Sequence, residues 1–213
     1  MPNKSIEDKL TEGRQYRKVM QIEVRAAEDN EMIVEGYATT FNQPYELWRD
    51  SGYVFMEQVD ARAFDDTDMS DVIMQYDHEG RVFARVSNRT LELSVDDHGL
   101  KIRADLSGTE IGRQLYEEIK GGYTDKMSFG FVVDKDERLI TEDNETGTVT
   151  VLRTIKSIGK LYDVSAVSLP ANNATEISSR SWCDGVIAEL TEENRKAEAR
   201  ERQKQKIKIM LSM

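Results

Sequence analysis

The sequence predicts a mainly β protein of the α+β class, with many short strands and one clear amphipathic helix. Apolar and polar residues alternate with a period of two through much of residues 17–180, as half-buried strands require. One segment instead repeats its apolar residues every four positions, which is typical of a helix. The 213 residues contain no Pro/Gly/Ser-rich linker, so we expect one hydrophobic core with tails.

Four strands are predicted in the first part of the chain, by alternation or by a continuous apolar run. They cover residues 20–26, 32–40, 53–56 and 71–77. The fourth is apolar almost throughout, which indicates a strand covered on both faces. It ends at His78, so we expect this histidine to be held in place by a buried strand.

A β-hairpin is the clearest feature of the middle of the chain. Apolar residues alternate through residues 91–95 and again through 100–104, and the turn residues 96–99 separate the two runs. Further alternation predicts three more strands, at residues 127–133, 148–155 and 161–169. Residues 157–159 separate the last two.

The predicted helix covers residues 108–120. Its apolar residues recur every four positions, and Gly121 ends the pattern. Ser107 and Glu110 have the spacing of a capping box at its start.

The C-terminal part of the chain has a different composition. From residue 186 onward Glu, Lys, Arg and Gln dominate, which favours a helix but leaves little apolar surface to bury. We therefore expect a flexible N-terminal leader (1–16), a folded domain (17–180) and a charged helical tail (181–213).

Composition excludes several classes of function. The net charge of −11 works against binding to a phosphate backbone, so we expect no nucleic-acid partner. No apolar stretch is long enough to span a bilayer, so we expect no membrane segment. The lone Cys183 cannot form an internal disulfide, and a cytosolic globular protein is expected.

Two histidines could supply an imidazole for catalysis, and they differ in context. His98 lies in the predicted turn, where turn preference alone explains a polar residue. His78 ends an apolar strand, a position compatible with a general base and also with a structural histidine. With two distant histidines, one cysteine and no His-Glu-x-x-His pattern, a metal hydrolase is a weak alternative, and we expect neither metal nor cofactor.

Ser128 is the candidate nucleophile. It lies among large apolar residues, and Gly130, the next residue on the same face of the strand, leaves open space beside its hydroxyl. A buried structural serine would fit the same pattern. Asp163, an ionisable residue in a largely apolar strand, could orient a catalytic histidine or simply face solvent at an edge.

Short motifs in a fixed order resemble the prohead proteases of tailed bacteriophages over residues 18–180. The motifs lie at residues 34–38, 41–42, 78, 91–93, 99–100, 127–131, 163–165 and 170–172. The resemblance implies a serine endopeptidase with Ser128 as nucleophile and His78 as general base. It implies less directly that Asp163 orients the histidine, because the herpesvirus relatives of the family use a second histidine for that role.

The same resemblance implies a fold and a biological setting. The expected fold is a small, strongly curved or closed β-barrel like that of the herpesvirus maturation proteases. The expected substrates are the scaffold or delta segment of the major capsid protein precursor, and the protease itself. The expected location is a procapsid in the host cytoplasm. Self-association as a homo-oligomer would be compatible with this setting. The alternative is a non-catalytic capsid-assembly or scaffold protein that retains the protease barrel.

One motif departs from the family pattern. The usual Leu-Gly-Arg after the histidine reads Phe83-Ala84-Arg85 here. Alanine tolerates fewer backbone angles than glycine, so the path of the chain after His78 could differ. Arg85 remains a candidate for substrate binding, together with Gly130.

Overall fold

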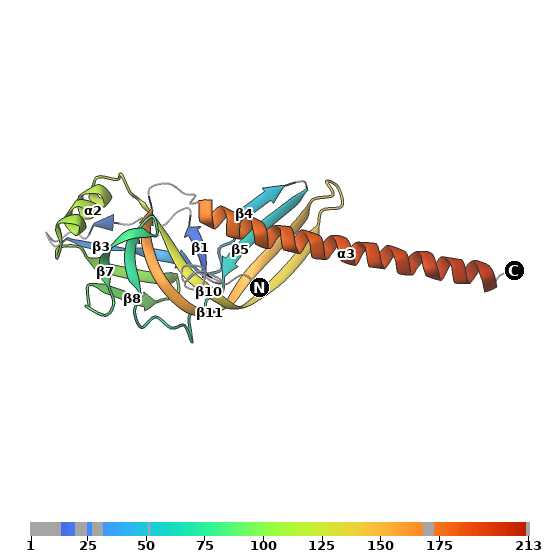
Figure 1. Cartoon of the computed structure of the whole chain (residues 1–213), viewed down its shortest axis with the longest axis horizontal. Helices are drawn as coiled ribbons and strands as arrows, with labels where there is room; N and C mark the ends of the chain where they lie inside the picture. The colour runs from blue at the N-terminus through green and yellow to red at the C-terminus, as the bar shows by residue number, and fades with distance from the viewer. Residues whose placement is uncertain (1–13, 20–24, 27–31, 51, 168–172, 212–213) are drawn as a thin grey trace, which may run out of the picture. The chain divides into compact units, whose positions relative to one another are not determined.

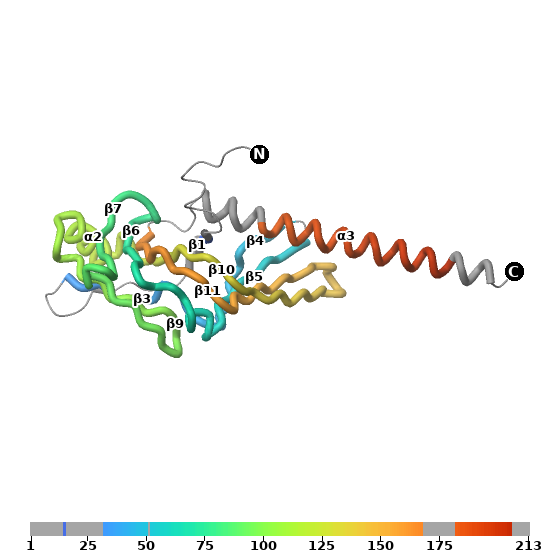
Figure 2. Tube along the Cα trace, turned by 60° about the horizontal axis from the view of Figure 1, so that its bottom comes forward, coloured from blue at the N-terminus to red at the C-terminus, as the bar shows by residue number. Residues whose placement is uncertain are grey.

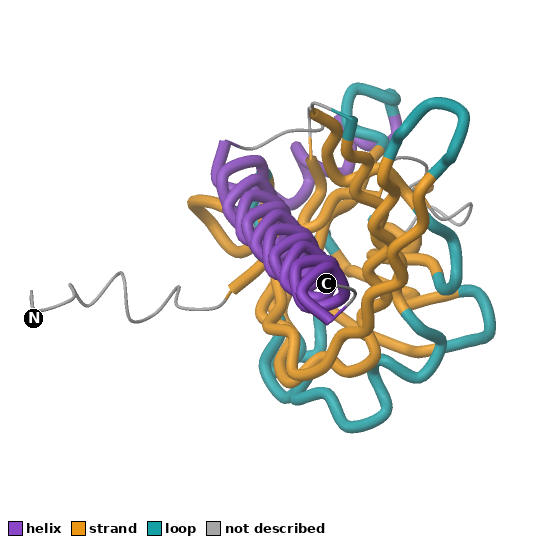
Figure 3. The backbone as a smooth tube through the Cα atoms, turned by 90° about the vertical axis from the view of Figure 1, so that its right-hand side faces the viewer, coloured by secondary structure: helices purple, strands orange, loops and turns teal. Residues whose placement is uncertain are grey.

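The computed structural model describes residues 14–19, 25–26, 32–50, 52–167 and 173–211. The chain divides into two compact units, 1–175 and 176–213. Strands make up most of the first unit, and loops connect them (Figure 3). The mainly β, α+β prediction is therefore confirmed, while the domain boundaries at 16/17 and 180/181 stay predictions.

The strands form two sheets (Figure 1). The larger sheet has the order β1-β10-β11-β5-β4, and β6 and β7 extend it beside β11; it consists of β1 (Arg14–Val19), β4 (Tyr45–Asp50), β5 (Tyr53–Val59), β6 (Ile73–Tyr76), β7 (Glu79–Arg85), β10 (Lys126–Glu142) and β11 (Val149–Val167). The smaller sheet has the order β2-β3-β9-β8 and consists of β2 (Arg25–Ala26), β3 (Ile33–Thr40), β8 (Leu91–Val95) and β9 (Gly99–Asp105). Strand pairing within the described residues closes neither sheet on itself, so a closed barrel stays a prediction.

Two long strands, β10 and β11, form the centre of the larger sheet and run side by side (Figure 2). The prediction of two separate strands for β11 is wrong, because a single strand runs through Ser157-Ile158-Gly159. The pairing of β10 with β11 is irregular between Gly130 and Asp136. These irregularities change which side chains face the core, but the two strands stay paired. The first half of β11 pairs in parallel with β5 and the second half with β6.

The core side of β10 carries the bulky residues that the alternation predicted. Met127, Phe129 and Phe131 are fully buried in the main hydrophobic cluster. The rings of Phe129 and Phe131 stack with centroids 4.4 Å apart, as residues two apart on one strand face can. This packing fixes the register of β10, because a slip of one residue would move the whole apolar set out of the core.

The helix α2 (Glu110–Lys120) confirms the predicted amphipathic helix. It buries Leu115 and Ile119 against the core. Its N-cap is Thr109, whose hydroxyl accepts from the amide of Gly112, and not Ser107 as the spacing suggested.

Several other expectations concern the ends of the chain. Residues 14–16, expected in the leader, belong to β1, which pairs with β10 from Arg14↔Val132 onward. The strand predicted at 20–26 lies outside the described residues except for β2. The helix α3 (Asn173–Leu211) covers the charged segment, and the tail boundary at residue 181 stays a prediction. No helix in the described part of the chain combines the length and apolarity needed to cross a membrane.

Candidate active site

His78 lies in a two-residue turn that joins β6 to β7. Tyr76 and Glu79 pair across the turn, and Asp77 and His78 both have positive φ, of 49° and 61°. Hairpin turns of this length favour such angles because their twist matches that of the strands, but Asn-Gly usually provides them. A histidine in this conformation is strained, and strained residues of this kind cluster at functional sites.

Neighbouring strands hold the turn in position. β6 runs parallel to β11, with Tyr76 beside Ala166. The amide of Asp77 donates to the carbonyl oxygen of Ala166 at 3.0 Å, which extends the pairing by one residue into the turn. The strained turn is therefore fixed by backbone hydrogen bonds to the strand that carries Asp163.

Ser128 and Asp163 lie on neighbouring strands of the same sheet. Ser128 pairs with Ser165, and Gly130 pairs with Asp163. Paired residues share a face of the sheet, and so do residues two apart on one strand. These four residues therefore form a small polar patch on the face opposite the buried phenylalanines of β10.

His78 bridges two corners of this patch. Its Nδ1 lies 2.5 Å from Oδ1 of Asp163, and its Nε2 lies 2.5 Å from Oγ of Ser128. The side chains of His78 and Asp163 are 5% and 0% exposed, and Ser128 is 3% exposed. The structure thus brings together the three residues that the sequence and the resemblance singled out, in a site almost closed to solvent.

Gly130 explains how the imidazole fits. Ser128 and Asp163 are diagonal neighbours across the β10–β11 ladder, about 7–8 Å apart between Cα atoms. A side chain at position 130 would stand directly opposite Asp163, on the face that His78 covers. Glycine places no side chain there, which leaves the ring room to reach both partners.

Ser165 is a polar member of the site that the sequence did not suggest. Its side chain is fully buried, and its hydroxyl donates to Oδ1 of Asp163 at 2.8 Å, the same oxygen that contacts His78. The signal was present, because Asp163 and Ser165 stand two apart in an apolar strand and so share one face. Two polar residues on one buried face indicate a hydrogen-bonded pair.

This arrangement can activate a serine hydroxyl. Nδ1–H of His78 can donate to the Asp163 carboxylate, which leaves Nε2 free to accept a proton from the Ser128 hydroxyl. Serine is a poor nucleophile unless a base takes its proton, and here the base lies within hydrogen-bonding distance. The geometry is that of a Ser-His-Asp triad, recognised by the roles its members can take.

Arg85 lies on β7 and forms a hydrogen-bonded ion pair with Asp71. The Arg85 guanidinium lowers the pKa of Asp71 to about 2, chiefly through this hydrogen bond. The preceding residue, Ala84, is buried and pairs with Met74, and its φ is not positive. Alanine at this position is therefore accommodated without strain, and a substrate-binding role for Arg85 stays a prediction.

The second histidine lies in the turn between β8 and β9, as predicted. His98 is exposed, and its ring meets that of Tyr37 edge to face at 4.6 Å between centroids. Within the described residues, no group of three or more His, Cys, Asp or Glu side chains is placed to hold a metal ion.

Comparison with known protein families finds a match over most of the chain. The model of the family described as caudovirus prohead serine protease, a serine peptidase family, matches residues 20–186, and so includes His78, Ser128 and Asp163. No curated protein and no solved structure matches the chain.

Proposed function

The chain belongs to the caudovirus prohead serine protease family, and from this premise we propose that it is a capsid-maturation endopeptidase with Ser128 as nucleophile. The observation that carries the proposal is the chain of two hydrogen bonds from Asp163 through His78 to Ser128. A buried serine with only a structural role would not need a histidine held in a strained turn.

The proposed reaction follows from these contacts. Ser128 Oγ attacks the scissile carbonyl while His78 Nε2 takes its proton, and His78 then gives that proton to the leaving amine. Asp163 keeps the imidazole in the productive tautomer and stabilises the imidazolium. Backbone N–H groups near the Ser128 hydroxyl would bind the oxyanion. Water, activated in turn by His78, then hydrolyses the acyl-enzyme.

Ser165 is a positioning residue in this proposal. Its hydroxyl fixes the carboxylate of Asp163 through a charge-assisted hydrogen bond. Because Asp163 is fully buried, its rotamer depends on the hydrogen bonds that its oxygens accept. Ser165 would therefore act on the reaction through Asp163 and His78, without touching substrate.

The proposed substrates are the scaffold or delta segment of the major capsid protein precursor, and the protease itself. Cleavage would take place inside the procapsid, in the host cytoplasm. Confinement within the shell raises the effective concentration of enzyme and substrate without new contacts, which suits a protease that must act only after assembly. The charged helix α3 is a candidate for encapsidation or for self-cleavage.

Intact mass over time tests the proposal. Wild type and Ser128→Ala would be followed alone and mixed with the capsid precursor of the same phage, with Ser94→Ala, an exposed strand serine, as matched control. Cleavage by wild type and Ser94→Ala, with none by folded Ser128→Ala, is expected. Equal behaviour of all three under assembly conditions would refute the protease and favour the non-catalytic assembly protein.

A further inference from the structure

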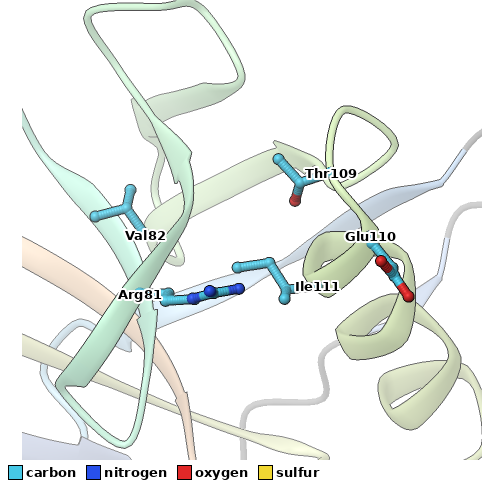
Figure 4. Close-up of a pocket in the computed structure, with 5 residues that line it drawn as sticks. All are labelled: Arg81, Val82, Thr109, Glu110 and Ile111. Carbon is cyan, nitrogen blue, oxygen red and sulfur yellow. The ribbon is translucent and has the colours of Figure 1, made fainter.

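A cleft opens between β7 and the start of α2 (Figure 4). Its volume is about 350 Å³, and its lining residues are Arg81, Val82, Thr109, Glu110 and Ile111. Val82 is 39% exposed, so an apolar wall of the cleft faces solvent. A space of this size is enough for one side chain of a peptide and part of its backbone.

The cleft lies close to the catalytic histidine along the chain. β7 begins directly after His78, and Arg81 comes three residues later, at most about 10 Å away in an extended strand. Tyr76 pairs with Glu79 and Met74 with Ala84, so the four residues 80–83 lie opposite Gln75 alone. Bulges of this kind redirect side chains, and they are common next to active sites.

Arg81 is the basic residue of this cleft, and Glu110 is its acidic residue. Among the described residues no hydrogen bond or ion pair engages its guanidinium, whereas Arg85 on the same strand is held by Asp71. Its side chain points across the cleft toward Ile111, and Glu110 lies on the far side of Ile111 (Figure 4). Arg81 is exposed, and all of its N–H donors remain available to a ligand.

We infer that this cleft is a specificity subsite for an acidic side chain of the substrate, with Arg81 binding the carboxylate. A guanidinium matches a carboxylate in a two-point hydrogen-bonded pair, which a neutral amide cannot reproduce. Val82 and Ile111 would pack on the methylene groups of the same side chain. The inference rests on the proposed function, because it requires a peptide bound with its scissile bond at Ser128.

The test compares cleavage preferences in a mixture of peptides of random sequence. Wild type, Arg81→Ala, Arg81→Glu and the surface control Arg62→Ala would each digest the mixture, and mass spectrometry would record the residues around every cleaved bond. Wild type and Arg62→Ala should favour Asp or Glu at one position near the bond. Arg81→Ala should reduce this preference roughly tenfold to 100-fold, and Arg81→Glu should replace it with a preference for Lys or Arg.

A digest with Ser128→Ala distinguishes failure of the subsite from failure of the proposed protease. Cleavage by wild type but not by Ser128→Ala, with the same acidic preference in the Arg81 variants, would overturn the subsite and leave the protease intact. Cleavage that persists in Ser128→Ala would overturn both, as would no cleavage by wild type under the assembly conditions in which it is expected to be active.

Discussion

Asparagine at position 163 should leave the sheet intact and remove most of the proteolytic activity. Asp163 is fully buried, and asparagine has nearly the same volume, so packing around β11 hardly changes. What changes is the charge and one acceptor: the carboxylate faces Nδ1 of His78 at 2.5 Å and accepts from Ser165 at 2.8 Å. An amide either loses its attraction for the imidazolium or donates to Nδ1 and imposes the wrong tautomer.

The size of the effect can be worked from this geometry. Two unit charges about 4 Å apart interact by about 4 kcal/mol at an effective dielectric constant of 20. On the proposed mechanism, His78 gains a proton only in the transition state, so this interaction would lower the barrier. Its loss corresponds to a drop of roughly 10³-fold in kcat. KM should change little, because Asp163 does not contact substrate.

The assay is cleavage of the capsid precursor under multiple-turnover conditions, with rates from intact mass. Asp125→Asn, which neutralises an exposed carboxylate just before β10, serves as control and should keep full activity. A thermal melt establishes that Asp163→Asn is folded. A folded Asp163→Asn enzyme with more than a tenth of wild-type kcat would refute the role of Asp163, and with it the reasoning from charge.

Three further outcomes are expected. Ser165→Ala should lower kcat by roughly tenfold to 100-fold with KM unchanged, and Ser165→Thr should restore part of the rate; a change confined to KM would contradict a positioning role. Gly130→Val should abolish activity by displacing His78 while the protein stays folded, and retained activity would show that the space is not needed. Arg153→Met should lower the unfolding free energy in urea by about 3–5 kcal/mol, because it leaves buried Glu57 without its ion-pair partner at 3.0 Å; a loss under 1 kcal/mol would contradict this.

Local chemistry explains which parts of the fold the sequence predicts well. The hairpin at residues 91–105 has clear alternation and turn residues, and α2 has a strong four-residue repeat with a glycine after it. Both depend on neighbours in sequence alone. The continuity of β11 depends instead on contacts from distant parts of the chain. β10 pairs with Ser157 and Ile158, the amide of Ile158 donates to the carbonyl oxygen of Ala63, and the carbonyl oxygen of Gly159 accepts from the amide of Asp68. The alternation by itself suggests an end there.

The candidate site divides in the same way. Ser128 with Gly130 is visible as a small polar face on an apolar strand, and His78 as the residue that ends another. The turn that aims His78 was not predictable, because Asp77-His78 is not a usual hairpin pair and its positive φ values are stabilised by contact with β11. The pairing of Ser128 with Ser165 required the register between β10 and β11, which only the folded sheet defines.

The near-complete burial of Ser128 bears on how cleavage could be timed. Its hydrogen bond to His78 already exists without substrate, while only 3% of the residue is exposed. On the proposed function, activation would need no rearrangement of the catalytic groups. It would need only a movement of the residues that cover the Ser128 hydroxyl, so that a peptide can enter. Regulation would then lie in access, and any event in the procapsid that loosens this region would start cleavage at once.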